Sequence, residues 1–591
     1  MSIYDEKPWL QHYDPGVKRT LEPYPDVPLH KFLQDAALQH PECPALITDA
    51  KLPLLGHVPA TLTYGELDAQ SDALACALIG LGLKKGDTVA LVMPNVAQFA
   101  ISYYGVLKAG GVVAATNPTY PPEKMAFQIN DCDAKIVITL TLFYPMIKEL
   151  QPKTQLKTVI ATNVKEALSA PARLLFTLAK EKKDGHRLDA LASGDHWLGD
   201  VIGRHMGQKP TVTVKGSDLA LFQYTGGTTG VSKAAMAQHK ALVANTLQAV
   251  AWTTVSEGEL AGKDRSQFVY LGALPLFHVF GLLVMLSQAM STGARIVLVP
   301  NARDIDNVVE IIHHYQPNVF LGVPALFNAV NNHARVKSGE VRFNSVWIAQ
   351  SGAAPLPPTT KKEFEAAGAK LLYEGYGMSE MPTATHNNPI IGVNKVGTVG
   401  MPLPDVECKI VSLDDGVTEM PVGEIGEIIM RGPNMMTGYY KMPTETANTL
   451  REHGGKHWVY SGDIGYMDAD GYFTIVDRKK DMALIGGVNV YPNTVEKALK
   501  EHPAVLEVGV AAVPHESKAG QETLKAWIVL KPGATASTDE LIKHCETRLA
   551  PYEVPRRFSF IKELPKSTVG KTLRRELVLM EMSDCERPMA D

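Results

Sequence analysis

Between Tyr64 and Leu140 the chain alternates between stretches with helical spacing of apolar residues and short runs that are apolar throughout. The expected helices cover residues 64–81, 95–109 and 122–131, and the expected strands cover 88–93, 112–116 and 134–140. Wholly apolar runs are typical of strands buried on both faces, as in parallel sheets whose crossovers are helices. The alternation therefore predicts an α/β fold with a mostly parallel sheet covered by helices.

The length requires more than one folding unit. At roughly 150 residues per domain, a chain of 591 residues is too long for a single compact core. Five consecutive charged residues, Asp477 to Asp481, separate a β-like stretch from a further strand-and-helix series of about 110 residues. A segment of that size fits a small domain. We predict a large multi-subdomain domain over residues 1–478 and a small α+β domain over residues 479–591.

Charge and cysteine usage exclude several classes of function. The net charge of −5 provides no overall basic field for nucleic acid or an anionic membrane, so any phosphate site must be local. The six cysteines are scattered and form no C-x-x-C pair, which favours reduced thiols in a reducing compartment and argues against a zinc site. The amino terminus lacks the basic-then-apolar order of a secretion signal. We expect a cytoplasmic protein that does not bind nucleic acid.

Two apolar segments raise the question of membrane contact. Residues 271–290 are long enough to cross a bilayer, but Pro275, His278 and Gly281 interrupt them, so we predict a buried strand, loop and helix. Residues 169–185 combine an apolar helix with several lysines. A surface helix with a solvated charged end is the favoured interpretation there, and a membrane-surface anchor is the alternative.

The strongest chemical signal is YTGGTTGVSK at residues 224–233, directly after an apolar run that we predict to be a strand. Glycines let a backbone bring N–H groups close to phosphate oxygens, and hydroxyls and a lysine add donors. A Walker A loop is excluded because Val231 and Ser232 stand where its second glycine is required. A nucleophile elbow is excluded because Ala234 stands at the position of its last glycine.

Further motifs follow this loop in a fixed order. They are LPLFHVFG (274–281), SGAAP (351–355), YEGYGMSE (373–380), YSGD (460–463), IVDRKKD (475–481), GGVNVYP (486–492) and PKSTVGK (565–571). Together with the loop they resemble the adenylate-forming superfamily of acyl-CoA synthetases, luciferases and adenylation domains, and are most similar to bacterial long-chain fatty acid:CoA ligases. The chain departs from the family pattern at Gly226, Ser232, Ala234 and Ser379.

The resemblance implies ATP, Mg²⁺ and CoA as cofactors and assigns their contacts. Tyr376 would stack on adenine, Asp463 would accept hydrogen bonds from the ribose, and Lys480 would be the hinge of a mobile small domain. An aromatic face suits a purine, and a carboxylate can accept two hydroxyl donors. The implied binding set is Thr225, Gly226, Gly227, Thr228, Thr229, Gly230, Lys233, Gly352, Ala353, Ala354, Glu374, Gly375, Tyr376, Gly377, Met378, Asp463, Ile475, Arg478, Lys480, Gly486 and Gly487.

The same resemblance assigns the catalytic residues. Lys571 is implied as the catalytic lysine, and His278 lies beside the acyl carboxylate. Ser379 is assigned to the α-phosphate and Glu380 to Mg²⁺, which prefers hard oxygen ligands. The implied reaction activates a fatty acid as acyl-AMP with release of pyrophosphate, because a free carboxylate is a poor electrophile, and then forms acyl-CoA and AMP.

The residues leave several alternatives open. The acyl group could be transferred to a carrier protein instead of CoA, or the acid could be medium-chain or aryl. A regulator without turnover would be expected to lose Lys571 or Glu380, and both are present. Apolar residues near the His278 motif are candidate walls of an acyl tunnel, with plain core as the alternative: Val279, Phe280, Leu282, Val284, Leu321, Val323 and Leu326. Peripheral contact with the membrane and a homodimer are both compatible with the sequence.

Overall fold

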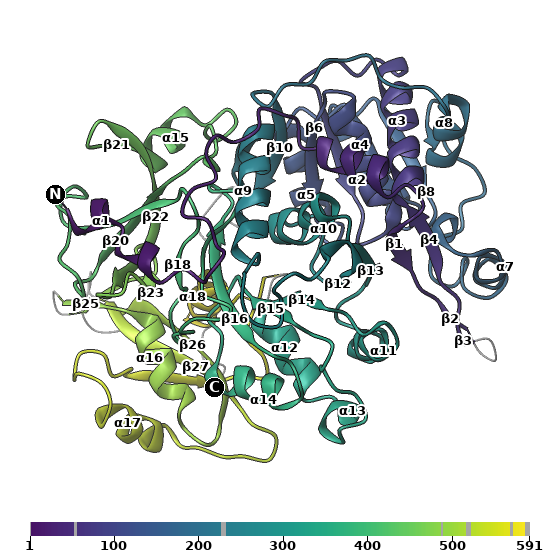
Figure 1. Cartoon of the computed structure of the whole chain (residues 1–591). Helices are drawn as coiled ribbons and strands as arrows, with labels where there is room; N and C mark the ends of the chain where they lie inside the picture. Colours follow the sequence, from purple (N-terminus) through teal and green to yellow (C-terminus); the bar gives the residue numbers. More distant parts are fainter. Residues whose placement is uncertain are drawn as a thin grey trace.

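The computed structural model describes residues 2–52, 56–225, 232–485, 488–515, 522–567 and 571–585 (Figure 1). The predicted alternation between residues 64 and 140 is confirmed, with small shifts at the ends of elements. Its elements are α3 (Tyr64–Gly80), β5 (Thr88–Val92), α4 (Ala97–Lys108), β6 (Val112–Thr116), α5 (Pro122–Asp131) and β7 (Ile136–Leu140). Thr63 caps α3, its hydroxyl accepting from the Glu66 amide while the Glu66 carboxylate accepts from the Thr63 amide.

Within the described residues, the first sheet has seven strands in the order β11-β10-β6-β5-β7-β8-β9. All neighbours in it are parallel except β10 and β11. Alternate side chains of β5 face different cores: Val89 and Leu91 contact the core that contains α3 and α4, whereas Ala90 and Val92 contact the core that contains α5. The remaining strands are β8 (Thr158–Thr162), β9 (His196–Trp197), β10 (Leu219–Tyr224) and β11 (Ala234–Gln238).

A nine-stranded sheet forms the second layer of the described chain, in the order β18-β17-β16-β15-β14-β12-β13-β1-β4. Its central strands, from β16 to β1, are parallel. It shares the largest hydrophobic core with the first sheet, and α3 and α4 belong to that core. Its strands are β1 (Pro44–Thr48), β4 (Ala60–Thr63), β12 (Val269–Gly272), β13 (Arg295–Leu298), β14 (Val319–Gly322), β15 (Ile348–Ser351), β16 (Leu372–Met378), β17 (Thr383–Asn387) and β18 (Met401–Pro402).

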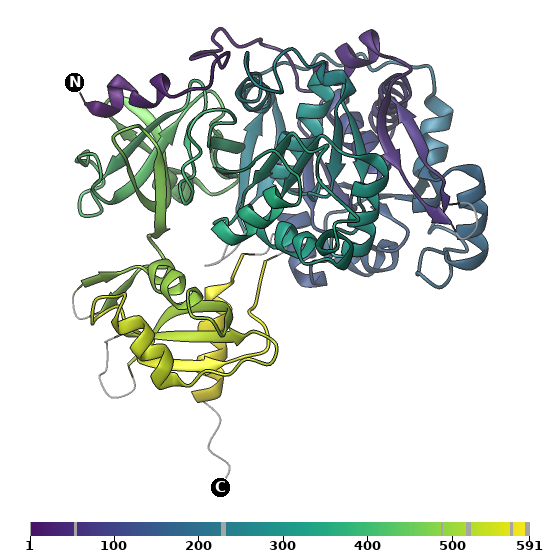
Figure 2. The same cartoon turned by 60° about the horizontal axis from the view of Figure 1, so that its bottom comes forward.

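An antiparallel sheet follows in the chain and is crossed by the N-terminal segment (Figures 1 and 2). Trp9 packs edge-on against Phe473 of this sheet, and the Tyr4 hydroxyl donates to the Met420 carbonyl. Its described strands are β19 (Glu407–Val411), β20 (Gly426–Arg431), β21 (Leu450–His453), β22 (Lys456–Met467) and β23 (Phe473–Arg478). A short pair, β2 (Lys51–Leu52) and β3 (Gly56–His57), projects beyond β1 and β4 at the edge of the nine-stranded sheet.

The C-terminal part forms a small α+β domain below the large one (Figure 2). Its hydrophobic cores consist of residues from Ala483 onward and are separate from those of the large part. The fold class predicted from the sequence is thereby confirmed. The elements of this domain are β24 (Ala483–Ile485), β25 (Val488–Val490), α16 (Pro492–Lys500), β26 (Val505–Pro514), β27 (Glu522–Leu530), α17 (Thr538–Glu546), β28 (Arg557–Phe560) and α18 (Arg574–Cys585).

The apolar stretch 271–290 is interior, as predicted. It contains the end of β12, a π-helix over Phe280–Ser287 and the start of α10, and the π-helix is buried along its whole length. No helix in the described ranges has the length and apolarity needed to cross a membrane. The cysteines whose side chains are described are free thiols, as expected: Cys43, Cys76, Cys132, Cys408 and Cys545.

The other helices cover the sheets and their edges. The α-helices are α1 (Ile3–Glu6), α2 (Lys31–Gln39), α6 (Tyr144–Leu150), α7 (Ala170–Ala179), α8 (Leu198–His205), α9 (His239–Trp252), α10 (Gln288–Thr292), α11 (Ile305–Tyr315), α12 (Pro324–Asn331), α13 (Ala334–Lys337), α14 (Pro358–Ala366) and α15 (Pro443–Thr449). Short 3₁₀ turns cover Pro8–Gln11, Gln151–Lys153, Val164–Ala167 and Arg265–Gln267.

Candidate active site

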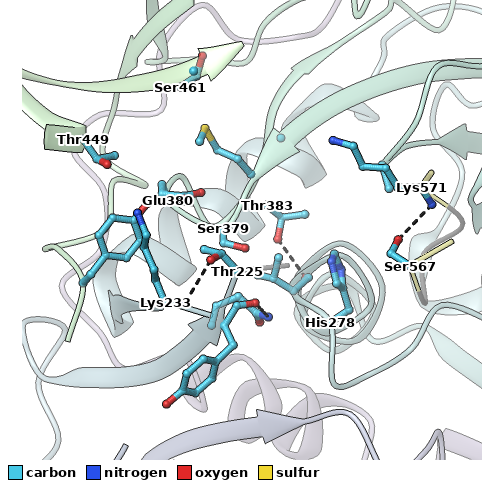
Figure 3. A pocket seen from close by; sticks show the side chains of 18 of the residues that line it. Thr225, Lys233, His278, Ser379, Glu380, Thr383, Thr449, Ser461, Ser567 and Lys571 are labelled. Atoms are coloured by element: carbon cyan, nitrogen blue, oxygen red, sulfur yellow. Dashed lines mark hydrogen bonds between the residues drawn. The ribbon is translucent and has the colours of Figure 1, made fainter. Parts of the chain in front are cut away.

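A cleft of about 1490 Å³ lies where the carboxyl ends of strands from both large sheets meet the small domain. In open α/β sheets this is the usual place for a ligand. Figure 3 shows side chains of the large part and of the small domain facing one another across it. The predicted site residues that line the cleft are Thr225, Lys233, His278, Gly352, Ala353, Gly375, Tyr376, Gly377, Met378, Ser379, Glu380, Arg478, Lys480 and Lys571.

The phosphate-type loop is closed at its two described ends. The Thr225 amide donates to the Lys233 carbonyl at 2.9 Å, and the Ser232 hydroxyl donates to the Thr225 carbonyl at 2.8 Å. These bonds continue the antiparallel pairing of β10 with β11. Ser232, one of the departures from the family pattern, thus helps to close the loop. The predicted contacts Gly226, Gly227, Thr228, Thr229 and Gly230 lie outside the described residues.

The side chains predicted to meet phosphate and metal are held by the segment from Tyr439 to Thr449. Lys233 forms an ion pair with Glu445, and its ammonium lies 5.1 Å from the centre of the Tyr439 ring. The Tyr439 hydroxyl donates to Glu380 Oε1 at 2.5 Å. This segment matches none of the motifs in the sequence, so Tyr439 and Glu445 were missed. Only its place in the fold brings it to the cleft.

The predicted adenine and ribose residues form one hydrogen-bonded group. Asp463 is almost fully buried; one of its oxygens accepts from the Tyr376 hydroxyl at 2.5 Å, and the other pairs with Arg478 Nε at 2.8 Å. The neighbouring Asp463 charge raises the pKa of Arg478, so its guanidinium stays charged. The structure therefore brings these three residues together, with Asp463 behind Tyr376 and Arg478. Three further predicted residues lie close in sequence to lining residues but do not line the cleft: Ala354, Glu374 and Ile475.

Close backbone approach explains two positions on the adenine side. A Cβ atom at Gly377 would lie 1.4 Å from the Thr383 carbonyl oxygen, so glycine alone fits there. Ala353 has a positive φ of 69°, which is uncommon outside glycine. Beside them, burial raises the pKa of Glu374 to about 8, although its carboxylate accepts a hydrogen bond from the Leu356 amide at 3.2 Å. Glu374 is thus largely protonated at neutral pH.

His278 lies just before the π-helix and faces the cleft. Burial lowers the pKa of its imidazole to about 4, so the ring is neutral at pH 7. Its Nδ1 accepts from the Phe280 amide at 3.2 Å, which assigns the ring proton to Nε2. A neutral ring whose Nε2–H has no hydrogen-bond partner among the described residues suits a substrate oxygen.

Lys571 reaches the cleft from the small domain. Its amide donates to the Ser567 hydroxyl at 3.1 Å, and the Ser567 amide donates to its carbonyl at 2.8 Å, so the backbones at Ser567 and Lys571 are held side by side. In Figure 3 its side chain enters from the side opposite Lys233 and Glu380. Burial lowers the pKa of Lys571 to about 8, with Arg478 adding to the decrease and Asp463 opposing it. The ammonium is therefore readily deprotonated just above neutral pH.

Near the boundary at residues 478 and 479, Arg574 forms contacts within the small domain, and a backbone amide of that domain donates across to the large part. Arg574 of α18 forms an ion pair with Asp481 at 3.2 Å and with Glu496 at 2.8 Å, and Asp477 accepts from the Asn493 amide at 2.8 Å. The side chain of Lys480, the predicted hinge residue, lines the cleft. The predicted CoA contacts Gly486 and Gly487 lie outside the described residues, between the paired strands β24 and β25.

The described residues fit a metal that is held mainly by substrate phosphates. They include no group of three or more histidine, cysteine or acidic side chains that could bind a metal on their own. Glu380 offers one carboxylate in the cleft, close to Lys233. Mg²⁺ is commonly bound by one or two carboxylates together with substrate phosphates and water. A single glutamate is sufficient on the protein side of such a site.

Most candidate tunnel walls belong to the hydrophobic cores. Val279 and Phe280 line the cleft, and the Phe280 ring lies against Gly352. The others are buried or partly buried in the two large cores: Leu282, Val284, Leu321, Val323 and Leu326. Packing in the core is the interpretation that fits these five residues.

Comparisons with known proteins agree over most of the chain. The AMP-binding enzyme family matches residues 33–440, and the AMP-binding enzyme C-terminal domain matches residues 494–571. A long-chain-fatty-acid–CoA ligase of Bacillus subtilis is 38% identical over 98% of each chain. The enzyme of the same name from Yersinia pestis is 35% identical over 97% of this chain and 98% of its own.

Solved structures give the same picture of the fold. ATP-bound MatB from Rhodopseudomonas palustris superimposes with a TM-score of 0.78 at 26% identity, covering 94% of this chain and 99% of its own. The anthranilate CoA ligase AuaEII in complex with anthranoyl-AMP has a TM-score of 0.80 at 23% identity, with coverage of 95% and 98%. At that identity the second likeness concerns the fold alone.

Proposed function

The chain belongs to the AMP-binding enzyme family, and from this premise we propose that it is an ATP-dependent fatty acid:CoA ligase with a preference for long chains. It would form acyl-AMP and pyrophosphate from the acid and ATP, and then acyl-CoA and AMP. The observation that carries this proposal is the cleft in which Lys571 of the small domain faces Lys233 and Glu380 of the large one. Near-complete alignment with two enzymes named long-chain-fatty-acid–CoA ligases supports the substrate class.

In the first half-reaction a carboxylate oxygen of the acid attacks the α-phosphorus of ATP, and the bond to pyrophosphate breaks. The loop from Thr225 to Lys233 would hold the β- and γ-phosphates, and Ser379 would donate to the α-phosphate. The ammonium of Lys571 would bridge the carboxylate and the α-phosphate, where negative charges approach each other. This is catalysis by positioning and charge stabilisation, as phosphoryl transfer generally requires.

The adenosine and the metal would be held by the remaining site residues. Tyr376 would stack on adenine beside Gly352 and Gly375, and Arg478 would contact the ribose. Asp463 lies behind these two side chains, so it would accept from the ribose hydroxyls once Tyr376 or Arg478 moves aside. Glu380 would ligate Mg²⁺, which neutralises charge on the phosphates when bound. His278 would donate a hydrogen bond from its Nε2–H to a carboxylate oxygen of the acid, which would help to orient the carboxylate toward the phosphorus.

In the second half-reaction the CoA thiol attacks the acyl carbon, and AMP leaves. We propose that residues 479–591 form the small domain and rotate about Lys480, which withdraws Lys571 and brings Gly486 and Gly487 to the pantetheine arm. Arg478 and Asp481 flank the hinge, and the Arg574 contacts with Asp481 and Glu496 would let the small domain turn as one body.

Location and partners follow from the substrates. We propose a cytoplasmic enzyme that acts on fatty acid, ATP and CoA and makes peripheral contact with the inner face of the membrane, where fatty acids partition. A homodimer stays a prediction. Light scattering after gel filtration measures the molar mass in solution and tests it. The alternative acceptor of the acyl group is a carrier protein. The alternative substrates are medium-chain or aryl acids.

A panel of carboxylic acids of graded chain length tests the proposal. With ATP and CoA present, we expect AMP and pyrophosphate release to rise toward long chains and thioester to form. If turnover does not depend on CoA but requires a carrier protein bearing phosphopantetheine, the protein is an enzyme that loads a carrier protein and not a CoA ligase. An optimum with benzoate-like acids would reassign the substrate class.

A further inference from the structure

Helix α7 (Ala170–Ala179) presents its apolar residues to solvent. Ala172 is its one buried residue, while Leu174, Leu175 and Leu178 are 60%, 40% and 75% exposed. Leu178 follows Leu174 by four residues and Leu175 by three, so it shares a face of the helix with both. A helix that belongs to a globular core normally turns such a face inward. The outward leucines therefore need a partner outside the fold.

A basic turn follows this helix directly. Lys180, Lys182 and Lys183 are all exposed, and among the described residues no carboxylate pairs with their ammonium groups. Glu181 lies between them but is buried, where it accepts from Asn163 at 2.8 Å and from Lys165 at 2.6 Å. Glu181 is thus directed inward and neutralised, and among residues 180–185 three exposed lysines outnumber one exposed carboxylate, that of Asp184. The outward charge of the turn is positive on a protein whose net charge is −5.

The exposed face is firmly attached to the large domain. Arg173 donates from its guanidinium to the backbone carbonyls of Lys165, Glu166 and Leu168, and the Phe176 ring meets the His186 ring at 5.7 Å. In both views α7 lies at the edge of the molecule away from the small domain (Figures 1 and 2). Rotation of the small domain would leave this surface in place.

We propose that the α7 surface, defined as Leu174, Leu175, Leu178, Lys180, Lys182 and Lys183, docks on an anionic lipid bilayer. Leucines at this spacing enter the boundary between headgroups and acyl chains, and lysines beside them bind lipid phosphates. The alternative occupant, a second copy of this chain, is disfavoured, because a symmetric contact would bring two like-charged lysine clusters together. Docking at this surface would hold the enzyme at the bilayer, from which it would take the fatty acid of its proposed reaction.

Sedimentation of the full chain with vesicles tests the proposal without substrates, so its outcome is independent of the ligase activity. The probes are phosphatidylcholine vesicles with and without phosphatidylglycerol. We expect stronger binding to the anionic vesicles, which falls about tenfold in the double variant Leu174→Ser/Leu178→Ser. In the triple variant Lys180→Gln/Lys182→Gln/Lys183→Gln we expect a similar loss that is confined to anionic vesicles.

Matched controls change the same residue types elsewhere on the surface. Leu38 is 79% exposed on α2, and Leu38→Ser should bind vesicles like the wild type. Lys337→Gln/Lys362→Gln/Lys500→Gln removes three exposed lysines from other elements and should retain the preference for anionic lipid. Equal loss in the control and test variants overturns the docking site. The docking site is also overturned if the wild type does not bind vesicles and forms a dimer that the leucine variant dissociates. In that case a second copy of the chain would cover α7.

Discussion

The hydroxyl of Tyr439 donates a hydrogen bond to Oε1 of Glu380, with 2.5 Å between the two oxygens. The bond fixes one oxygen of the carboxylate proposed to ligate Mg²⁺ and leaves the other for the metal. Partners of metal-ligating carboxylates orient them, and their loss typically costs tenfold or more in affinity or activity. Tyr439→Phe should therefore raise the Mg²⁺ concentration for half-maximal adenylation by about tenfold.

The neighbouring tyrosine provides the control for this prediction. Tyr440 donates to Asp133 at 2.8 Å and does not contact Glu380. Tyr440→Phe should leave the Mg²⁺ dependence of pyrophosphate exchange unchanged. If the two variants respond alike, Tyr439 acts through the stability of the segment and does not position Glu380.

Glu445 forms an ion pair with the ammonium of Lys233, the side chain proposed to bind phosphate. A triphosphate bound at the loop must displace this carboxylate, so the ion pair competes with ATP. We expect Glu445→Gln to lower the KM for ATP by roughly threefold, in keeping with the modest strength of partly exposed ion pairs. Glu452→Gln removes an exposed carboxylate from the adjacent strand β21 and should not change this KM. A raised KM in Glu445→Gln would mean that Glu445 assists binding.

Lys571 should be needed for one half-reaction and not for the other. Lys571→Ala is expected to abolish adenylate formation while leaving much of the thioester formation from preformed acyl-AMP. The two half-reactions are assayed separately, by pyrophosphate release and by acyl-CoA formation. Equal loss in both would remove Lys571 from its assigned role.

The pKa of Lys571 adds a pH dependence to this prediction. Because its pKa is about 8, the ammonium is present below that pH and is lost above it. The kcat/KM for adenylation, which reports the pKa values of the free enzyme, should thus fall as the pH rises through about 8. Lys571→Arg keeps its charge throughout this range, so any activity it retains should not show the decline. If the activity of the arginine variant declines with the same midpoint pH, the decline is due to the titration of a group other than Lys571.

Stiffening the proposed hinge should act mainly on the second half-reaction. Lys480→Pro fixes φ at that residue and is expected to impair thioester formation more than adenylation. Lys480→Ala removes the same ammonium without restricting the backbone and serves as the control. A larger loss in adenylation for the proline variant alone would place the hinge at another residue.

Glu374 should make the fold less stable as the pH rises. Its pKa is raised from 4.5 to about 8, so below pH 4.5 it is protonated in both the folded and the unfolded chain. Between these values only the unfolded chain ionises, and the free energy of unfolding should fall by roughly 1 kcal/mol for each pH unit. Glu374→Gln keeps the acceptor for Leu356 and should lose this contribution. Urea unfolding across the range, compared between the two proteins, measures the difference.

Much of the large domain could be predicted from the chain. Strand β5 and helix α4 were recognised because their apolar patterns are local and strong, and their bounds shifted by only a few residues. The motif residues Tyr376, Arg478 and Lys571 were identified by resemblance, and all three line one cleft. Tyr439 and Glu445 were missed because an ordinary tyrosine and an ordinary glutamate have no pattern of their own.

The sequence by itself determined the α/β class, the buried strands and the residue types able to bind a triphosphate, since these depend on periodicity and on chemistry within a few residues. The tertiary structure decided which side chains meet. Asp463 lies 87 residues from Tyr376, and Lys233 lies 212 residues from Glu445. It also decided that the leucines of α7 face outward, because a helical pattern defines an apolar face but its packing decides where that face points. Contacts of this range depend on how the three sheets of the large part and the small domain, with its separate cores, are placed around one cleft, which no local pattern specifies.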